Sequence, residues 1–298
     1  MIKKAVIAAA GLGTRMLSVT KELPKEMLPL YASEREGFLS LKPVLQLIFE
    51  QAYDFGIRDF CFIVGRGKRA IEDHFTPDYS YNETLRKKNN IDYDKYAIGL
   101  DHFYEKLKNC AIFWVNQSPP LGFGHAVLQT SSYIGDDEDF FVFAGDTLIL
   151  SERKQHITHI VNSYKKENAD IAFLMQTVED PQSYGVVSVI ESSEGVYYVN
   201  RVVEKPAVPM SNLAIVPIYI FKHQIFNHLK HLNPDSRNEV QLTDAIQSCL
   251  SMKGKVIATK MKHDELRLDV GTPETYFKAQ LDSFRYYNNS PVDLAGSE

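Results

Sequence analysis

Short apolar runs alternate with segments of helical periodicity along much of the chain. Residues 6–10, 60–64 and 111–116 are apolar runs short enough to be buried strands. Between the first two, residues 42–55 carry apolar side chains at helical spacing, with a proline early and Gly56 directly after the end. This strand–helix–strand order predicts a parallel sheet joined by right-handed helical crossovers.

The rest of the chain extends this pattern. Residues 79–108 are polar, tyrosine-rich and helical in spacing, which predicts a helical flap. Residues 183–187 and 198–203, separated by a turn at 192–195, predict an antiparallel hairpin added to the sheet. The other expected elements are helices at 68–75, 125–133, 158–167, 238–250 and 273–284, strands at 140–144, 171–178, 211–221 and 255–261, and a frayed end at 288–298. We therefore expect a three-layer, Rossmann-like α/β fold with a mixed, mostly parallel sheet.

Composition narrows the class of protein. The chain has 298 residues and no change of composition that would mark a linker, so we expect one large domain. A net charge of −5, with acidic and basic residues interspersed, argues against nucleic acid as a partner. No apolar segment precedes the first strand as a signal peptide or membrane span, so we expect a cytoplasmic protein without membrane contact. Cys61, Cys110 and Cys249 are widely spaced in apolar surroundings and are expected to be reduced core residues.

A glycine turn and a basic loop follow the first predicted strand. Gly11 and Gly13 let the backbone approach a ligand closely. Arg15, Lys21 and Lys25 place positive charges within a short stretch after the turn. Such cations, together with the backbone N–H groups of the turn, predict a phosphate-binding site without identifying the phosphate compound.

Two better-known glycine motifs do not fit this turn. The dinucleotide-binding fingerprint requires a third glycine where this chain has Met16. A P-loop requires Ser or Thr after a Gly-Lys pair, but the pairs that begin at Gly67 and Gly254 are followed by arginine and valine. Both motifs are therefore excluded.

Asp146 is the strongest metal-binding candidate. It follows an apolar run and Gly145, at the expected carboxyl edge of a parallel sheet, where α/β folds bind ligands. A carboxylate near phosphates is suited to Mg²⁺, which takes one or two carboxylates together with phosphate oxygens and waters. The alternative is an aspartate that only stabilises a turn.

The sequence Gly11-Leu-Gly-Thr-Arg15, followed by Pro24-Lys25, is similar to the signature of sugar-1-phosphate nucleotidylyltransferases. The chain resembles in particular the bacterial and archaeal UTP:glucose-1-phosphate uridylyltransferases, because residues 66–75, 184–187 and 203–206 are similar to blocks of that family. The resemblance extends from Ala5 to about Phe284. Two departures are Ser18, where the family usually has proline, and a longer segment at 33–41, which leaves the shape beside the site open.

The resemblance implies roles for individual residues. Gln117 and Gly122 would contact uracil, although the residues alone allow Gln117 to be a satisfied loop amide and His125 a helix-start residue. Asp269 would be a second metal ligand, since related thymidylyltransferases carry an aspartate in a similar Asp-x-Gly-Thr block. The expected nucleotide-binding residues are Ala10, Gly11, Gly13, Thr14, Arg15, Lys25, Gln117 and Gly122. The expected sugar-phosphate-binding residues are Gly185, Glu204, Lys205 and Asn212, and the expected catalytic residues are Arg15, Lys25, Asp146 and Lys205.

The resemblance also implies a reaction. Glucose 1-phosphate would attack the α-phosphate of UTP in line, assisted by Mg²⁺, and form UDP-glucose and pyrophosphate through positioning and charge neutralisation. Residues 1–150 would be the nucleotide-binding half, 151–270 the sugar-phosphate-binding half, and 271–298 a C-terminal helix and tail, in a homodimer or homotetramer. The alternatives are a thymidylyltransferase that uses dTTP and a non-catalytic sugar-nucleotide sensor. The complete set of charged residues counts against the sensor.

Overall fold

The computed structural model describes residues 2–34, 37–87, 91–191 and 195–288. Within these ranges a nine-stranded mixed sheet forms the centre, in the order β5-β4-β1-β6-β11-β8-β12-β10-β9. Parallel pairing joins β5, β4, β1 and β6, and also β8 with β12, whereas the other neighbours are antiparallel. The strands are β1 (Lys4–Ala8), β4 (Asp59–Val64), β5 (Ala111–Asn116), β6 (Asp139–Ala144), β8 (Ile171–Thr177), β9 (Gly185–Glu191), β10 (Val196–Glu204), β11 (Leu213–Lys222) and β12 (Val256–Lys260).

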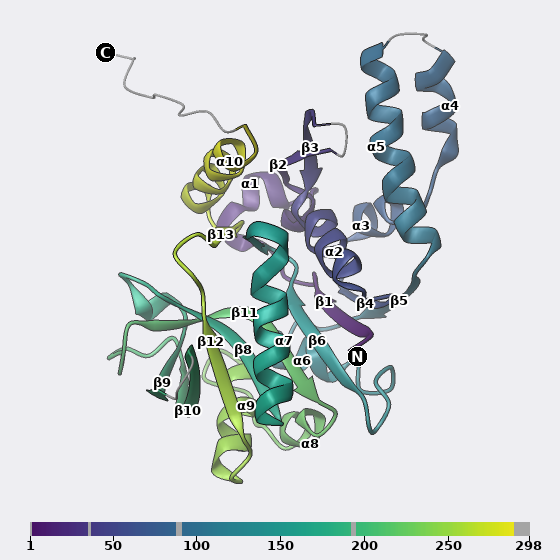
Figure 1. The fold of residues 1–298 in the computed structure, drawn as a ribbon. Coiled ribbons are helices and arrows are strands. Elements are labelled where there is room, and N and C mark those ends of the chain that lie inside the picture. Colours follow the sequence, from purple (N-terminus) through teal and green to yellow (C-terminus); the bar gives the residue numbers. More distant parts are fainter. Residues whose placement is uncertain (1, 35–36, 88–90, 192–194, 289–298) are drawn as a thin grey trace.

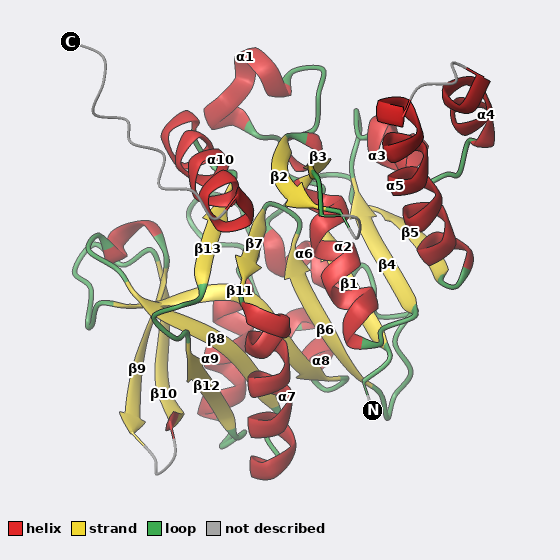
Figure 2. Ribbon diagram, turned by 45° about the horizontal axis from the view of Figure 1, so that its top comes forward, coloured by secondary structure: helices red, strands yellow, loops and turns green. Residues whose placement is uncertain are grey.

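Helices cover both faces of this sheet (Figures 1 and 2). The helices are α1 (Leu17–Thr20), α2 (Val44–Phe55), α3 (Arg69–His74), α4 (Tyr79–Lys87), α5 (Ile91–Lys108), α6 (Phe123–Leu128), α7 (Gln155–Glu167), α8 (Ile225–Lys230), α9 (Leu242–Ser251) and α10 (Pro273–Asn288). Along β1, Ala5 and Ile7 belong to the core beneath α2 and α7, while Val6 belongs to the core beneath α6, α8 and α9. This alternation follows from the two-residue period of a strand, and it explains why β1 is apolar from Ala5 to Ala8. The expected three-layer fold is confirmed.

Two small sheets complete the fold. β7 (Thr147–Leu150) pairs antiparallel with β13 (Leu266–Asp269), and β2 (Pro29–Ser33) pairs with β3 (Leu39–Pro43). The β2–β3 hairpin packs on α10, where the rings of Tyr31 and Phe284 lie 5.1 Å apart. The longer segment at 33–41 therefore forms the end of a hairpin, apart from residues 35 and 36, which lie outside the described residues. The prediction that a helix begins at Lys42 was wrong, because residues 42 and 43 pair with β2 and α2 begins at Val44.

The other expectations are confirmed with local corrections. The helical flap is present as α4 and α5, which project beyond the sheet (Figure 1). The antiparallel hairpin is β9–β10, at the end of the central sheet. Most of its expected turn at 192–195, and the expected frayed end after residue 288, lie outside the described residues.

Several helices differ from the predicted bounds. α7 begins at Gln155 rather than residue 158, and α10 continues to Asn288 rather than ending at 284. α6 ends at Leu128 rather than near Tyr133, and the Thr130 hydroxyl donates to the carbonyl of Val127 at the end of the helix. α9 begins at Leu242 rather than Asn238. Asn238 has a φ of 61°, outside the helical region, and Gln241 is extended. Between them, the backbone of Val240 donates to Leu121 and accepts from Gly124, both at 2.8 Å. A helix-like spacing of side chains is overridden here by backbone pairing with a distant loop.

Candidate active site

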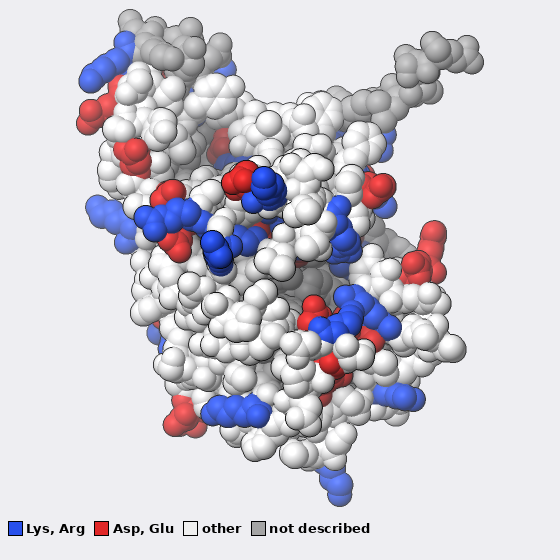
Figure 3. Space-filling model, turned by 180° about the vertical axis from the view of Figure 1, so that it is seen from behind, with Lys and Arg blue, Asp and Glu red and all other residues white. Residues whose placement is uncertain are grey.

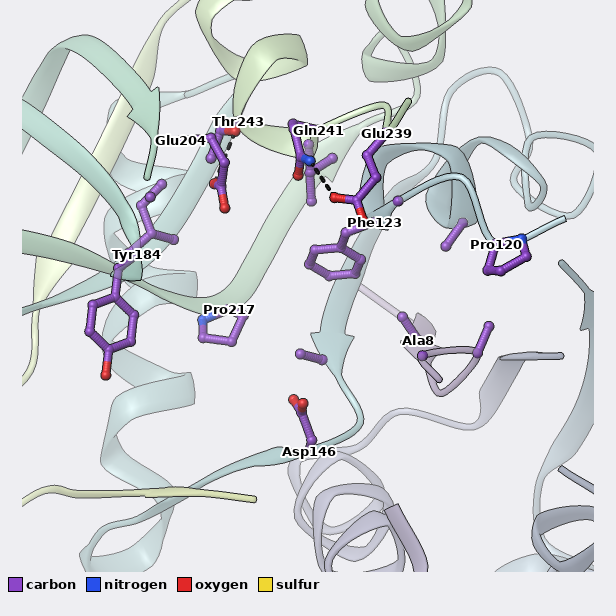
Figure 4. A pocket seen from close by; sticks show the side chains of 18 of the residues that line it. Ala8, Pro120, Phe123, Asp146, Tyr184, Glu204, Pro217, Glu239, Gln241 and Thr243 are labelled. Atoms are coloured by element: carbon purple, nitrogen blue, oxygen red, sulfur yellow. Dashed lines mark hydrogen bonds between the residues drawn. The ribbon is translucent and has the colours of Figure 1, made fainter. Parts of the chain in front are cut away.

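A cavity of about 560 Å³ opens where β1 and β6 end, with Ala8 and Ala144 in its wall. This is the carboxyl edge of the parallel strands, where α/β folds place their ligands. In Figure 4, Glu204, Thr243, Gln241 and Glu239 lie along one side of the cavity, and Asp146 lies opposite them. The predicted site residues that line it are Ala10, Gly11, Gly13, Thr14, Lys25, Gln117, Gly122, Asp146, Gly185, Glu204 and Lys205. Arg15, Asn212 and Asp269 are not among its lining residues.

The conformation of the glycine turn after β1 is set by Gly13 and its contact with Thr20. Gly13 has a φ of 65°, a conformation that favours glycine, and a Cβ there would lie 3.0 Å from the Cβ of Thr20. The Thr20 hydroxyl donates to the carbonyl of Gly13 at 2.7 Å. Lys21, one of the three cations predicted to hold phosphate, is instead solvent-exposed beside Glu22 and does not line the cavity.

Lys25 and Asp146 form an ion pair on the floor of the cavity, where the ammonium donates to Oδ2 of the carboxylate. Burial raises the pKa of Asp146, but the charge and hydrogen bond of Lys25 outweigh it and hold that pKa below its usual range. Burial alone would lower the pKa of Lys25. The negative charges around it, of which that of Asp146 has the largest effect, outweigh burial and raise this pKa above its usual value. Both groups are therefore charged, and each depends on the other.

Asp269 lies beside Asp146 although the two are far apart in sequence. The pairing of β13 with β7 places Asp269 opposite Thr147, and the backbone of Val270 donates to the carbonyl of Asp146 at 2.9 Å. Burial and then the negative charge of Asp146 raise the pKa of Asp269. A divalent cation bound between the two carboxylates would offset their mutual repulsion.

These carboxylates fit Mg²⁺ better than a metal that needs a complete protein cage. Among the described residues, no group of three or more His, Cys, Asp and Glu side chains is placed to hold a metal. Mg²⁺ commonly takes one or two carboxylates and fills its remaining positions with phosphate oxygens and water. The residues present therefore suit a metal that arrives with a phosphate ligand.

Two arginines border the carboxylates. Arg267 donates to Oδ2 of Asp269 at 3.2 Å, and its guanidinium lies 4.8 Å from the centre of the Tyr184 ring. The guanidinium of Arg15 packs against Gly271, two residues after Asp269, where a Cβ would lie 3.1 Å from its Nη2. The positive charge of Arg15 acts to lower the pKa of Asp269. Arg15 is thus at the edge of the cavity, beside the carboxylates rather than in the wall.

Next to Lys25 in the sequence, Glu26 forms a buried ion pair with Lys68. The Lys68 ammonium donates to Oε2 of Glu26 at 2.7 Å, and Glu26 is only 1% exposed. Burial raises the pKa of Glu26 above its usual range, although the charge of Lys68 opposes this shift. Lys68 comes from the block at 66–75, so part of that block supports the turn that carries Lys25.

Gln117 and Gly122 lie together on the other side of the turn. The amide nitrogen of Gln117 donates to the carbonyl of Gly122 at 3.0 Å. Gly122 has a φ of 97°, and a Cβ there would lie 2.8 Å from the carbonyl of Val240. Only glycine allows the loop to approach the segment before α9 so closely.

The hairpin β9–β10 supplies the opposite wall. Gly185 pairs with Glu204, and the backbone of Lys205 donates to the carbonyl of Tyr184 at 3.0 Å. Oε2 of Glu204 accepts from the Thr243 hydroxyl at 3.2 Å, and the ammonium of Lys205 lies 3.6 Å from Oε1 of Glu204. This wall therefore presents a carboxylate and an ammonium to the cavity, from adjacent residues.

Asn212 lies near the far end of this wall. Its backbone carbonyl accepts from Val178 at 2.9 Å, and its side chain is exposed.

Several lining residues were absent from the predictions. They are Glu26, Tyr184, Arg267, Glu239, Gln241 and Thr243. Arg267 could have been found, because it is two positions before Asp269 on a strand and so shares its face. Gln241 and Thr243 gave no local signal, since only the contact between the α9 segment and the loop at 121–124 places them here.

The surface and the helices add two observations. Figure 3 shows basic and acidic side chains interspersed over one face of the molecule, around a central hollow. In the part of the chain that the structure describes, no helix is both long and apolar enough to cross a bilayer.

Comparison with known proteins gives similarities over nearly the whole chain. Residues 4–284 match the nucleotidyl transferase family. A UTP–glucose-1-phosphate uridylyltransferase of Pseudomonas aeruginosa is 35% identical over 94% of this chain and 95% of its own length. A solved UDP-glucose pyrophosphorylase in complex with UDP-glucose is 32% identical with a TM-score of 0.80, over 97% of this chain and 100% of the other. A UTP-bound UGPase from Acinetobacter baumannii is 30% identical with a TM-score of 0.80, over 98% of this chain and 95% of the other.

Proposed function

Because this chain belongs to the nucleotidyl transferase family, we propose that it makes UDP-glucose and pyrophosphate from UTP and glucose 1-phosphate. One observation carries this proposal: a single cavity is lined by the glycine turn and Gln117, by Glu204 and Lys205, and by Asp146. Figure 4 shows Asp146 across this cavity from Glu204. A nucleotide and a sugar phosphate can thus meet at one carboxylate. The relatives that carry this activity by name match this chain over nearly its whole length.

The nucleotide side would hold UTP. The residues in contact with it would be Ala10, Gly11, Gly13, Thr14, Arg15, Lys25, Gln117 and Gly122. Backbone N–H groups of the turn and the charges of Arg15 and Lys25 would bind the triphosphate. Since Lys25 is paired with Asp146, a triphosphate would offer it a second anionic partner. Lys25 would then bridge the carboxylate and the triphosphate.

The hairpin side would hold glucose 1-phosphate. Glu204 can accept hydrogen bonds from sugar hydroxyls, and Lys205 can pair with the phosphate. Gly185 lets Thr243 pack closely against this wall, because a Cβ there would lie 2.9 Å from Cγ2 of Thr243. Asn212 would contact the sugar only if the ligand extends past the lining residues. In this arrangement residues 1–150 bind the nucleotide, 151–270 the sugar phosphate, and 271–298 provide the C-terminal helix and tail.

The reaction would be an in-line displacement at the α-phosphorus. The phosphate oxygen of glucose 1-phosphate is already ionised near neutral pH, so no general base is required. Lys205 orients this nucleophile, and Arg15 and Lys25 neutralise the triphosphate, so that two anions can approach each other. Mg²⁺, held by Asp146 and Asp269, would stabilise charge at the reacting phosphates. Pyrophosphate leaves, and no covalent intermediate with the protein forms.

We also propose that the protein assembles as a homodimer or homotetramer. Light scattering coupled to size-exclusion chromatography measures the mass directly, and a mass of about 34 kDa, that of one chain, would contradict this.

The function is tested by pyrophosphate release from UTP, dTTP, CTP, ATP and GTP, each with glucose 1-phosphate and Mg²⁺. We expect the highest kcat/KM with UTP, and UDP-glucose as the product. A higher kcat/KM with dTTP would identify a thymidylyltransferase. Binding of UDP-glucose without any pyrophosphate release would identify a sensor.

A further inference from the structure

The orientation of the Gln117 amide is fixed by its neighbours. Gln117 follows β5, is 5% exposed and lines the cavity. Its amide nitrogen lies 3.0 Å from the carbonyl of Gly122 and 3.0 Å from Nδ1 of His125. A carbonyl only accepts, so the end of the amide that faces Gly122 must be the nitrogen. Within the described residues, no hydrogen bond occupies Oε1 of Gln117, and this oxygen is the part of the amide left for a ligand.

His125 completes this constraint through its tautomer. Nδ1 faces an N–H of Gln117 and must accept, so the proton of the neutral ring is on Nε2. Burial lowers the pKa of His125, which favours this neutral form. The structure places the amide nitrogen of Gln129 3.1 Å from Nε2 of His125. Because Nε2 is the donor in this tautomer, the Gln129 amide has to be turned by 180° so that its oxygen accepts from Nε2. His125 and Gly122 thus accept both amide hydrogens of Gln117.

We propose that His125 determines base specificity by holding Gln117 with its carbonyl oxygen toward the base. This inference rests on the proposed function, in which Gln117 meets the pyrimidine edge. N3 of uracil carries a hydrogen and donates to that oxygen. N3 of cytosine carries a lone pair, which would face the oxygen unpaired. A glutamine that rotated could present its nitrogen to cytosine instead. The Gly122 carbonyl is one acceptor that opposes this rotation, and His125 adds the second, so that a rotated amide would lose two hydrogen bonds rather than one.

The proposal predicts different changes of kcat/KM for different nucleotides, whereas a non-specific distortion of the site would lower kcat/KM for all of them alike. Thymine has the same N3–H as uracil, so loss of His125 should not change the ratio of kcat/KM for UTP to that for dTTP. The ratio for UTP to CTP should fall, because an unrestrained amide accommodates either base. A site that requires a hydrogen bond can reject an analogue lacking it by a factor of about 10⁴, so a fall of at least about 10-fold is well within range.

The test compares His125→Phe with the wild type in pyrophosphate-release assays with UTP, dTTP and CTP. Phenylalanine keeps a flat ring but has no acceptor at the position of Nδ1. We expect the UTP-to-CTP ratio to fall at least about 10-fold and the UTP-to-dTTP ratio to stay within about 2-fold. His125→Asn, whose Oδ1 can accept from Gln117, should restore much of the discrimination. His125→Leu is the second acceptor-free variant, should the phenylalanine variant fail to fold.

Two results would overturn the proposal. One is an unchanged UTP-to-CTP ratio in a folded acceptor-free variant. The other is an equal change for CTP and dTTP, which would mean that His125 only supports the loop. Failure of the proposed function is distinct, because the wild-type protein would then release no pyrophosphate from UTP and glucose 1-phosphate.

Discussion

Replacing Asp146 with asparagine removes one negative charge from the centre of the cavity and keeps the shape of the side chain. In the proposed mechanism this carboxylate holds the metal together with Asp269 and sets the position of Lys25. Asparagine still offers an oxygen to Lys25, so the hydrogen bond can persist, but the ligand charge at the metal is halved. Removal of one preorganised charge or donor typically lowers kcat by a factor of about 10² to 10³, which corresponds to about 3–4 kcal/mol.

A loss of stability must be separated from a loss of catalysis, because Lys25 loses its counter-charge in Asp146→Asn. Asp170→Asn is a matched control. Asp170 also pairs with a lysine, Lys222 at 2.9 Å, and does not line the cavity. We expect both variants to lose some thermal stability. Only Asp146→Asn should lose turnover.

The assay is initial-rate pyrophosphate release at saturating UTP and glucose 1-phosphate, over a range of Mg²⁺ concentrations, at a temperature where both variants are folded. Asp146→Asn should show a kcat reduced at least about 100-fold that added Mg²⁺ does not restore. A kcat within about 3-fold of wild type would remove Asp146 from the reacting centre. An equal loss in Asp170→Asn would show that the effect is structural.

Three further predictions address other parts of the structure. Lys205→Met should raise the KM for glucose 1-phosphate at least about 10-fold and leave the KM for UTP nearly unchanged, since Lys205 contacts only the sugar phosphate in the proposed arrangement. The control Lys21→Met, outside the cavity, should change neither KM in the same initial-rate assay. A rise of both KM values in Lys205→Met would contradict the assignment. Lys68→Met should lower the free energy of unfolding by about 1–3 kcal/mol, because the buried carboxyl of Glu26 loses the donor and counter-charge of Lys68 and takes up a proton more readily. The double variant Glu26→Gln/Lys68→Met should recover at least half of this loss in urea unfolding, and an equal loss in both would argue against the ion pair. Burial lowers the pKa of His156 to about 3. Below about pH 6.5 the unfolded chain therefore binds a proton that the folded chain excludes. As a result, the free energy of unfolding should be lower by about 2 kcal/mol at pH 5 than at pH 8. His156→Gln should remove that part of the pH dependence, and an unchanged pH profile of unfolding would show that His156 does not cause it.

The sequence predicted the parts of the site that local chemistry defines. Asp146 was identified from an apolar strand followed by Gly-Asp, and the structure places it at the carboxyl edge beside Ala8. Gly13 was identified from the need for close backbone approach, and its positive φ agrees. Glu204 and Lys205 came from resemblance alone, because an adjacent acid and base on a strand usually lie on a solvated face. Asp146, Gly13, Glu204 and Lys205 all line the same cavity.

The remaining features depend on contacts between distant segments. Asp269 reaches Asp146 only through the pairing of β13 with β7, and neither strand is long enough to be recognised from periodicity. The segment before α9 has helical spacing, yet its backbone pairs with the loop near Gly122. Lys21 was expected beside phosphate from its spacing to Lys25, but it follows the short helix α1 and faces solvent. Local patterns do not encode such pairings.

The central claim is that the uridylyl group of UTP is transferred to the phosphate of glucose 1-phosphate. The most direct measurement follows the label from [α-³²P]UTP and from [γ-³²P]UTP, in separate reactions with glucose 1-phosphate and Mg²⁺. This account predicts that the α label appears in UDP-glucose and the γ label in pyrophosphate. Transfer of the γ label to the sugar phosphate, or its release as inorganic phosphate with the α label remaining in UDP, would contradict it.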